Sequence, residues 1–134
     1  MAKGKSTGAW AITLVRAGYG VALLCAPGAL IKMTGDPVTG QPGGASRARP
    51  SRRACGVARV LGVRHLVQAG LTAAALQAQP GSPYPLAGGA AVDALHATTM
   101  VGLALVDRGA RRVALADTGV ELAFATAGGL TAIR

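Results

Sequence analysis

Eight side chains that could carry chemistry stand inside long apolar stretches of this 134-residue chain. They are three arginines, three carboxylates and two histidines: Arg16, Arg59, Arg64, Asp93, Asp117, Glu121, His65 and His96. In apolar surroundings such groups pair with one another, line a polar pathway or bind a cofactor, because an isolated charge there is costly. The sequence therefore predicts an intramembrane polar core made of these eight side chains.

The elements that must position these groups are apolar runs of about 20 residues, the length of helix that crosses a bilayer. Four such runs occur, at 10–31, 54–76, 84–106 and 113–133. The breaks between them are rich in Gly and Pro or are short and charged, so consecutive helices should be antiparallel neighbours. We predict an all-α integral membrane protein with four antiparallel transmembrane helices in a single domain, and a cytoplasmic Arg/Gly/Pro-rich loop at 32–53.

The composition agrees with lipid surroundings. Hydrophobic residues make up 51% of the chain, while 14% are charged and 3% aromatic, and the mean hydropathy is +0.41. A soluble domain usually carries about a quarter charged residues. The apolar fraction also excludes a disordered chain, and two cysteines, Cys25 and Cys55, are too few for a disulfide scaffold.

A net charge of +9 is the kind of charge that proteins use to bind the phosphates of nucleic acid. The four aromatic residues are too scattered to form a base-stacking surface, and the basic residues gather in the breaks between apolar runs. That distribution is typical of the cytoplasmic loops of a bacterial inner-membrane protein. We expect no nucleic-acid partner.

The basic residues also predict the orientation. One side of the membrane would hold Lys32, Arg47, Arg49, Arg52, Arg53, Arg108, Arg111 and Arg112, and the other Lys3, Lys5 and Arg134. The first side should be cytoplasmic, which places both termini outside, Trp10 and Tyr84 at the outer interface, and both cysteines, reduced, toward the cytoplasm. A secretory signal is the alternative for the first run, and Arg16 inside that run argues against it.

Depth along the helices predicts which charges pair. At about 1.5 Å per residue, Arg59 and Asp117 lie at similar depths, as do Arg64 and Glu121, and Arg16 and Asp93. Helical spacing places Arg64, His65, Gln68 and Thr72 on one arc of their helix, with Arg59 outside it. Two roles are open to these groups: they hold the bundle together, or they line a functional polar cavity.

His65 and His96 fall near the middle of two adjacent spans, an arrangement that could hold a b-type haem with room from Gly62, Gly70, Gly88 and Gly89. The same groups could line a quinone pocket or, with Asp93 and Glu121, a small proton or solute transport module. A hydrogen-bonded structural role is the simpler interpretation, and we expect no cofactor and no metal. Phosphate-binding, dinucleotide, zinc-protease and nucleophile motifs do not occur in the sequence, so we expect no enzymatic activity.

Three short segments resemble a known family. Arg59-Val-Leu-Gly62-Val-Arg64, Val-Asp93-Ala-Leu and Leu-Ala-Asp117 are similar to the small DoxX-like four-helix membrane proteins of actinobacteria, whose function is unassigned, over about residues 54–125. The resemblance implies a compact four-helix membrane domain with the Arg and Asp positions as its polar core, and it carries over no activity. The Arg-rich first loop and His65 depart from that group.

These observations favour a non-catalytic accessory or assembly subunit of a larger inner-membrane complex. Helix faces rich in Ala and Gly suit side-by-side association with other membrane subunits or with a second copy of the chain. The alternatives are an electron-transfer protein that binds haem b or quinone through His65 and His96, and a small transport module around Asp93 and Glu121.

Overall fold

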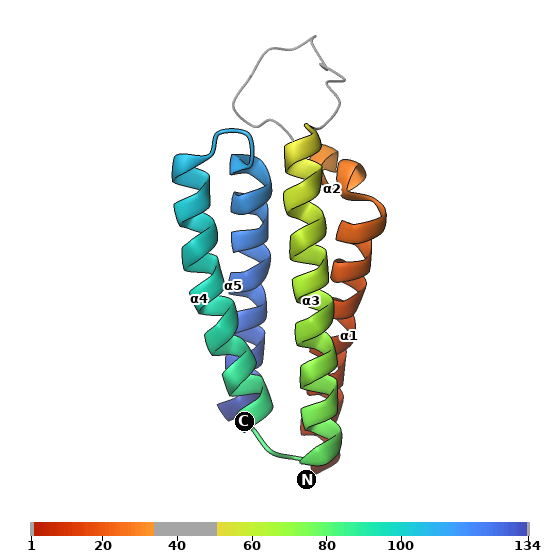
Figure 1. Cartoon of the computed structure of the whole chain (residues 1–134). Coiled ribbons are helices and arrows are strands. Elements are labelled where there is room, and N and C mark those ends of the chain that lie inside the picture. The colour runs from red at the N-terminus through yellow and green to blue at the C-terminus, as the bar shows by residue number, and fades with distance from the viewer. Residues whose placement is uncertain (1, 34–50, 134) are drawn as a thin grey trace.

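The computed structural model describes residues 2–33 and 51–133, which form five helices and no strand. The four long helices are α1 (Ala2–Cys25), α3 (Arg52–Ala78), α4 (Tyr84–Val106) and α5 (Arg111–Ile133), and the short α2 (Pro27–Met33) follows α1. Figure 1 shows α1 beside α3 and α4 beside α5, with α2 at one end of the bundle. Helix α1 begins, and α5 ends, at the opposite end. The all-α prediction is confirmed.

The predicted span 10–31 is wrong at its second end, because α1 stops at Cys25 and Ala26 is not helical. Pro27 explains the break: proline has no backbone N–H and disfavours the helical conformation of the residue before it. The chain restarts as α2 with Pro27 in the first helical position. Most of the predicted loop 32–53 lies outside the described residues, namely 34–50 with Arg47 and Arg49 among them. Arg134 also lies outside them.

Helix α3 begins two residues before the predicted span, at Arg52. The hydroxyl of Ser51 accepts a hydrogen bond from the backbone N–H of Ala54 at 3.1 Å, which satisfies one of the unpaired donors in the first turn. The α4 bounds are those predicted, and α5 begins two residues early. A tight connection with Gly81 at φ 83° joins α3 to α4, and glycine adopts that backbone conformation without strain.

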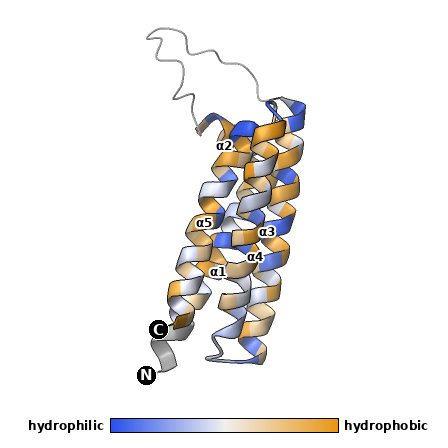
Figure 2. Cartoon of the chain, turned by 90° about the vertical axis from the view of Figure 1, so that its left-hand side faces the viewer, coloured by the Kyte–Doolittle hydropathy of each residue, from blue (hydrophilic) through white to orange (hydrophobic). Residues whose placement is uncertain are grey.

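Within residues 2–33 and 51–133, three helical segments are long and apolar enough to cross a membrane: Thr7–Cys25 within α1, all of α4 and all of α5. Helix α3 is as long but more polar, because it carries Arg52, Arg53, Arg59, Arg64 and His65. Large apolar side chains face outward on every long helix, for example Leu14, Leu71, Leu95 and Leu122. Figure 2 shows hydrophobic residues along most of the length of the helices, with hydrophilic residues at intervals between them.

The interior is built from small residues that let the helices come close. Ala58, Ala69, Ala97 and Ala114 are buried in it. Helices α1 and α3 touch backbone to backbone at Gly20 and Gly62, where a Cβ on Gly62 would lie 2.8 Å from the Gly20 carbonyl oxygen. Small residues at helix crossings permit this approach. The crossing fixes the rotation of α3, and so the direction of Arg64 and His65.

Candidate functional site: a buried ionic cluster

Polar side chains from all four long helices meet inside the bundle, and we call them the interior cluster. Its members are Arg16 of α1; Arg64, His65 and Gln68 of α3; Asp93 and His96 of α4; and Asp117 and Glu121 of α5. His65, Asp93 and Glu121 are fully enclosed. Residues three or four apart on a helix share a face, so each helix presents its polar residues on the side turned inward.

Arg16 and Asp93 join α1 to α4. The Arg16 Nη1 atom donates to Asp93 Oδ1 at 2.6 Å, and Nη2 contacts Oδ2, so the two planar groups meet through two parallel hydrogen bonds. The guanidinium also stacks over the Phe124 ring, 4.4 Å from its centre. This is the Arg16–Asp93 pair predicted from depth along the helices.

Arg64 joins α3 to α5 through the predicted contact of its Nη1 atom with Glu121 Oε1. Its Nη2 atom lies 3.6 Å from Asp93 Oδ1, so Arg64 stands between the two carboxylates. The amide of Gln68 donates to Asp93 Oδ1 at 2.7 Å and to the Gly89 carbonyl at 3.3 Å. These contacts tie α3 to α4, which otherwise touch along only a short part of their length.

The predicted pair of Arg59 with Asp117 is wrong, and Arg59 does not belong to the polar core. Arg59 is exposed on α3, whereas its neighbour Ala58 is fully buried. The two residues differ by about 100° around the helix, so the match in depth could not produce a contact. Asp117 lies instead between the two histidines.

The imidazoles of His65 and His96 flank Asp117. His65 Nε2 lies 3.2 Å from Asp117 Oδ1 and 3.5 Å from Glu121 Oε1, and His96 Nε2 lies 3.3 Å from Asp117 Oδ2. The edge of the Tyr19 ring packs on His65, with ring centres 4.9 Å apart. His65, Asp117 and Glu121 thus bring one imidazole and two carboxylates close together, and His96 lies on the far side of Asp117.

The hydrogen bonding of the interior cluster is incomplete. Six buried side-chain atoms in the described part of the chain lack a hydrogen-bond partner: Arg64 Nη2, His65 Nδ1, Gln68 Oε1, His96 Nε2, Asp117 Oδ2 and Glu121 Oε2. All six belong to this cluster. Native proteins pair the large majority of their buried polar atoms, so such a concentration at one place needs an explanation.

A groove between α3 and α4 leads toward the cluster from the side of the bundle. Its volume is about 490 Å³. Its walls are mainly apolar, from Val67, Leu71 and Val92, and Arg64 and Gln68 line its inner part. Neither histidine lines the groove, although the His96 side chain keeps 17% of its surface exposed. The cluster is therefore buried but lies close to the surface at Arg64 and at His96.

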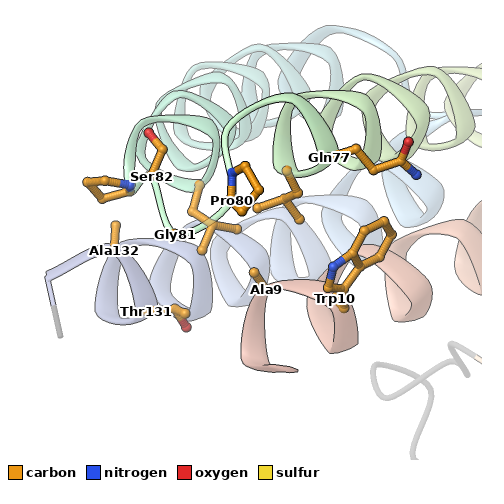
Figure 3. Close-up of a pocket in the computed structure, with 11 residues that line it drawn as sticks. Ala9, Trp10, Gln77, Pro80, Gly81, Ser82, Thr131 and Ala132 are labelled. Carbon is orange, nitrogen blue, oxygen red and sulfur yellow. The ribbon is translucent and has the colours of Figure 1, made fainter. Parts of the chain in front are cut away.

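A second cavity, of about 290 Å³, lies at the end of the bundle where α1 begins and α3 turns into α4 (Figure 3). Trp10 and Gln77 line it together with Pro80, Gly81 and Ala132, and none of its lining residues is charged. Trp10 packs at this end against Leu76 and Leu86, and the exposed Tyr84 lies at the same end of the bundle. This cavity is separate from the interior cluster.

The glycines expected to make room for haem lie elsewhere. Gly62 is used by the α1 crossing, while Gly70 and Gly88 face open space on the outside. The Gly89 carbonyl accepts a hydrogen bond from the Gln68 amide. Because the Asp117 carboxylate also stands between the two histidines, the arrangement does not fit a planar macrocycle ligated from both sides.

Sequence reasoning missed the roles of Gln68, Tyr19 and Phe124. Gln68 was placed on the right face of its helix but not among the site residues. Tyr19 follows Arg16 by three positions, a spacing that could have placed it on the same face. Helical spacing also places Phe124 on one arc with Asp117 and Glu121, but its contact with Arg16 was not predicted: its ring completes the enclosure of the guanidinium.

Comparisons with known proteins add no relative: the chain matches no family model, no curated protein and no solved structure.

Proposed function

We propose that this chain is a four-helix protein of the bacterial plasma membrane, with α3 as the fourth transmembrane helix. Packing supports the proposal, since α3 lies along α1 and shares its depth. Of its two intramembrane arginines, Arg64 turns inward to Glu121, and Arg59 lies near enough to a helix end to extend its head group toward the interface. The basic loops then place the α2 end in the cytoplasm and both termini outside.

Thiol labelling tests this topology. Cys25 is exposed and Cys55 half-buried, both at the α2 end of the bundle. A membrane-impermeant maleimide should label them in inverted vesicles and not in intact spheroplasts. A cysteine-free chain carrying Ser82→Cys in the α3–α4 connection is the matched control and should show the reverse. Labelling of both ends from the same side would overturn the four-span topology.

Within that membrane domain, we propose that the interior cluster binds and passes a small cation, so that the chain works as a small transport module. The observation that carries this is the set of unpaired buried atoms in the cluster. A polar network that serves only to hold helices together is expected to satisfy its own members, because a half-satisfied one is worse than an apolar core. Three carboxylates against two guanidiniums leave an excess of negative charge, which favours a cation.

Flux in liposomes tests the transport proposal. Purified protein should carry protons or divalent metal ions into vesicles that contain a pH-sensitive or a metal-sensitive dye. Glu121→Gln keeps the shape of the side chain and removes its charge, and it should abolish the flux. Asp107→Asn is the matched control, because this carboxylate lies outside the cluster and caps the α4–α5 connection. Equal flux in wild type, Glu121→Gln and empty vesicles would reject the proposal.

An accessory-subunit role is the second candidate, and one feature of the surface favours it. Gly88 and Gly102 lie on the same outer face of α4, where a Cβ would meet nothing within 4 Å. Small outward-facing residues allow another membrane helix to approach closely. Extraction in mild detergent should then give a particle much larger than one chain on native mass measurement. A monomer would reject this candidate.

DoxX-like membership remains a proposal that rests on the sequence segments. It is supported by the fact that Arg64, Asp93 and Asp117 from those segments meet in the interior cluster and that Gly62 lies at the α1 crossing. The haem and quinone alternatives have less support. The Asp117 carboxylate stands between the two histidines, and neither histidine lines the α3–α4 groove.

A further inference from the structure

The donors around Asp117 have the spacing of metal ligands. One donor atom each from His65, Asp117 and Glu121 lies within 4.8 Å of the others, and all three residues are buried. The His65 Nε2 atom is 3.2 Å from Asp117 Oδ1 and 3.5 Å from Glu121 Oε1. Ligands bound tetrahedrally at about 2.0 to 2.2 Å from zinc stand about 3.3 to 3.6 Å from one another. The two separations from His65 are therefore close to those that a metal ion would impose, and the third donor pair lies within 4.8 Å.

His96 lies on the other side of Asp117, outside this group of three donors. Its Nε2 atom is 3.3 Å from Asp117 Oδ2, yet neither atom has a hydrogen-bond partner. His96 therefore faces the second oxygen of Asp117, in the place of an outer-shell partner of that carboxylate. His65 and His96 are the two histidines of the chain, so all of its imidazole is gathered here.

Asp117 is the carboxylate of the cluster whose charge no arginine of the described residues neutralises. Asp93 is neutralised by Arg16, and Glu121 Oε1 is held by Arg64, but among the described residues Asp117 contacts no guanidinium. Glu121 Oε2 has no hydrogen-bond partner and remains free to bind. Arg64 then becomes an outer-shell group that orients the Glu121 carboxylate, as outer-shell partners do at known metal sites.

We propose that His65, Asp117 and Glu121 form a binding site for a divalent transition-metal ion such as Zn²⁺. The inference rests on the proposed cation function and names the substrate class. An imidazole with two carboxylates suits zinc and neighbouring first-row metals, whereas Mg²⁺ and Ca²⁺ prefer oxygen ligands alone. The exposed part of His96 and the groove at Arg64 are the routes by which the ion reaches the site.

Cobalt substitution tests the site on the full-length protein in detergent, purified without a histidine tag and treated with a chelator. Co²⁺ should bind at one ion per chain, give the visible absorption bands of a low-coordinate nitrogen and oxygen site, and be displaced by Zn²⁺ but not by Mg²⁺. Absence of binding, or a spectrum of hexaaqua cobalt alone, would overturn the proposal.

Variants then assign the ligands. His65→Gln, Asp117→Asn and Glu121→Gln should weaken Co²⁺ binding by more than the roughly 10–100-fold typical of losing an outer-shell partner. Asp107→Asn should bind as the wild type does. Unchanged binding in the three ligand variants would refute the assignment. If these variants do not fold, the wild type still decides: paramagnetically shifted imidazole resonances must appear with Co²⁺, and their absence refutes it.

The metal-site proposal and the transport proposal can be rejected independently of each other. Binding without flux leaves the metal site in place and removes the transport proposal, whereas proton flux without Co²⁺ binding leaves a transport module and removes the metal site.

Discussion

Arg16 has a more enclosed guanidinium than Arg64, with 5% of its side chain exposed against 20%. It donates two hydrogen bonds to Asp93, and the face of the Phe124 ring covers it. A charge in such a place is stable only while its partner remains, because neither lipid nor water replaces the lost contact. At the scale of single residues, the interior cluster therefore depends on complete pairs rather than on individual charges.

Arg16→Ala should destabilise the protein far more than Arg59→Ala. The first change removes the paired guanidinium from the buried Asp93 carboxylate and leaves it Gln68 and the more distant Arg64, and breaking a buried ion pair costs about 3 to 5 kcal/mol in soluble interiors. The second removes an exposed arginine of the same bundle. Thermal unfolding in detergent, followed by circular dichroism, measures the difference. Equal melting temperatures for the two variants would contradict the burial of Arg16.

At the scale of helices, the crossing of α1 and α3 sets the geometry of the cluster. Gly20 and Gly62 face each other, and a Cβ on either residue would come within 2.9 Å of the other's carbonyl oxygen. Real Cβ atoms do not approach backbone this closely, so any larger residue must push the two helices apart. Arg64 and His65 follow Gly62 by two and three positions and would move with α3.

Gly62→Ala should therefore lower stability, although alanine is the better helix former by about 1 kcal/mol. Overpacking at a tight contact costs about 1 to 3 kcal/mol, which outweighs that gain. Gly56→Ala on the same helix is the matched control, because its Cβ would meet nothing within 4 Å and only the helix-forming gain remains. Thermal melts should move in opposite directions. A stabilised Gly62→Ala would show that the crossing is looser than described.

At the scale of the whole molecule, a cluster of charged side chains lies inside and many large apolar side chains lie outside. His65, Asp93, Asp117 and Glu121 are the largest fully enclosed side chains among the described residues. Leu71, Leu95 and Leu105, by contrast, are each about 70% exposed. Exposed apolar surface of this extent needs a covering of lipid or of partner helices. This reversal of the soluble pattern supports the membrane proposal more directly than helix length does.

The protein should accordingly remain in the membrane pellet after alkaline carbonate extraction and should aggregate when detergent is removed. Peripheral proteins held by charge would be released by the carbonate, so the treatment separates insertion from the electrostatic attraction expected of a chain with a net charge of +9. Recovery of a monodisperse protein in detergent-free buffer would contradict the membrane assignment at once.

The sequence by itself determined where the long helices lie and, Arg59 excepted, which charges they enclose. Runs of apolar residues predicted α4 to the residue and the other long helices with shifted ends. Two of the three ion pairs also followed from depth, since rise per residue is nearly constant in an α-helix. The error at Ala26 arose because the predicted span ran through Pro27. The effect of proline on the residue before it is local, so this break could have been predicted from the sequence.

Tertiary structure decided the partners of Asp117. Arg59 and Asp117 share a depth, but the Gly20–Gly62 contact turns α3 so that Ala58 and His65 face inward and Arg59 faces out. Rotation about a helix axis depends on packing against another helix, and no local property of α3 specifies it. For the same reason, the meeting of His65 and His96 at one carboxylate required the assembled bundle.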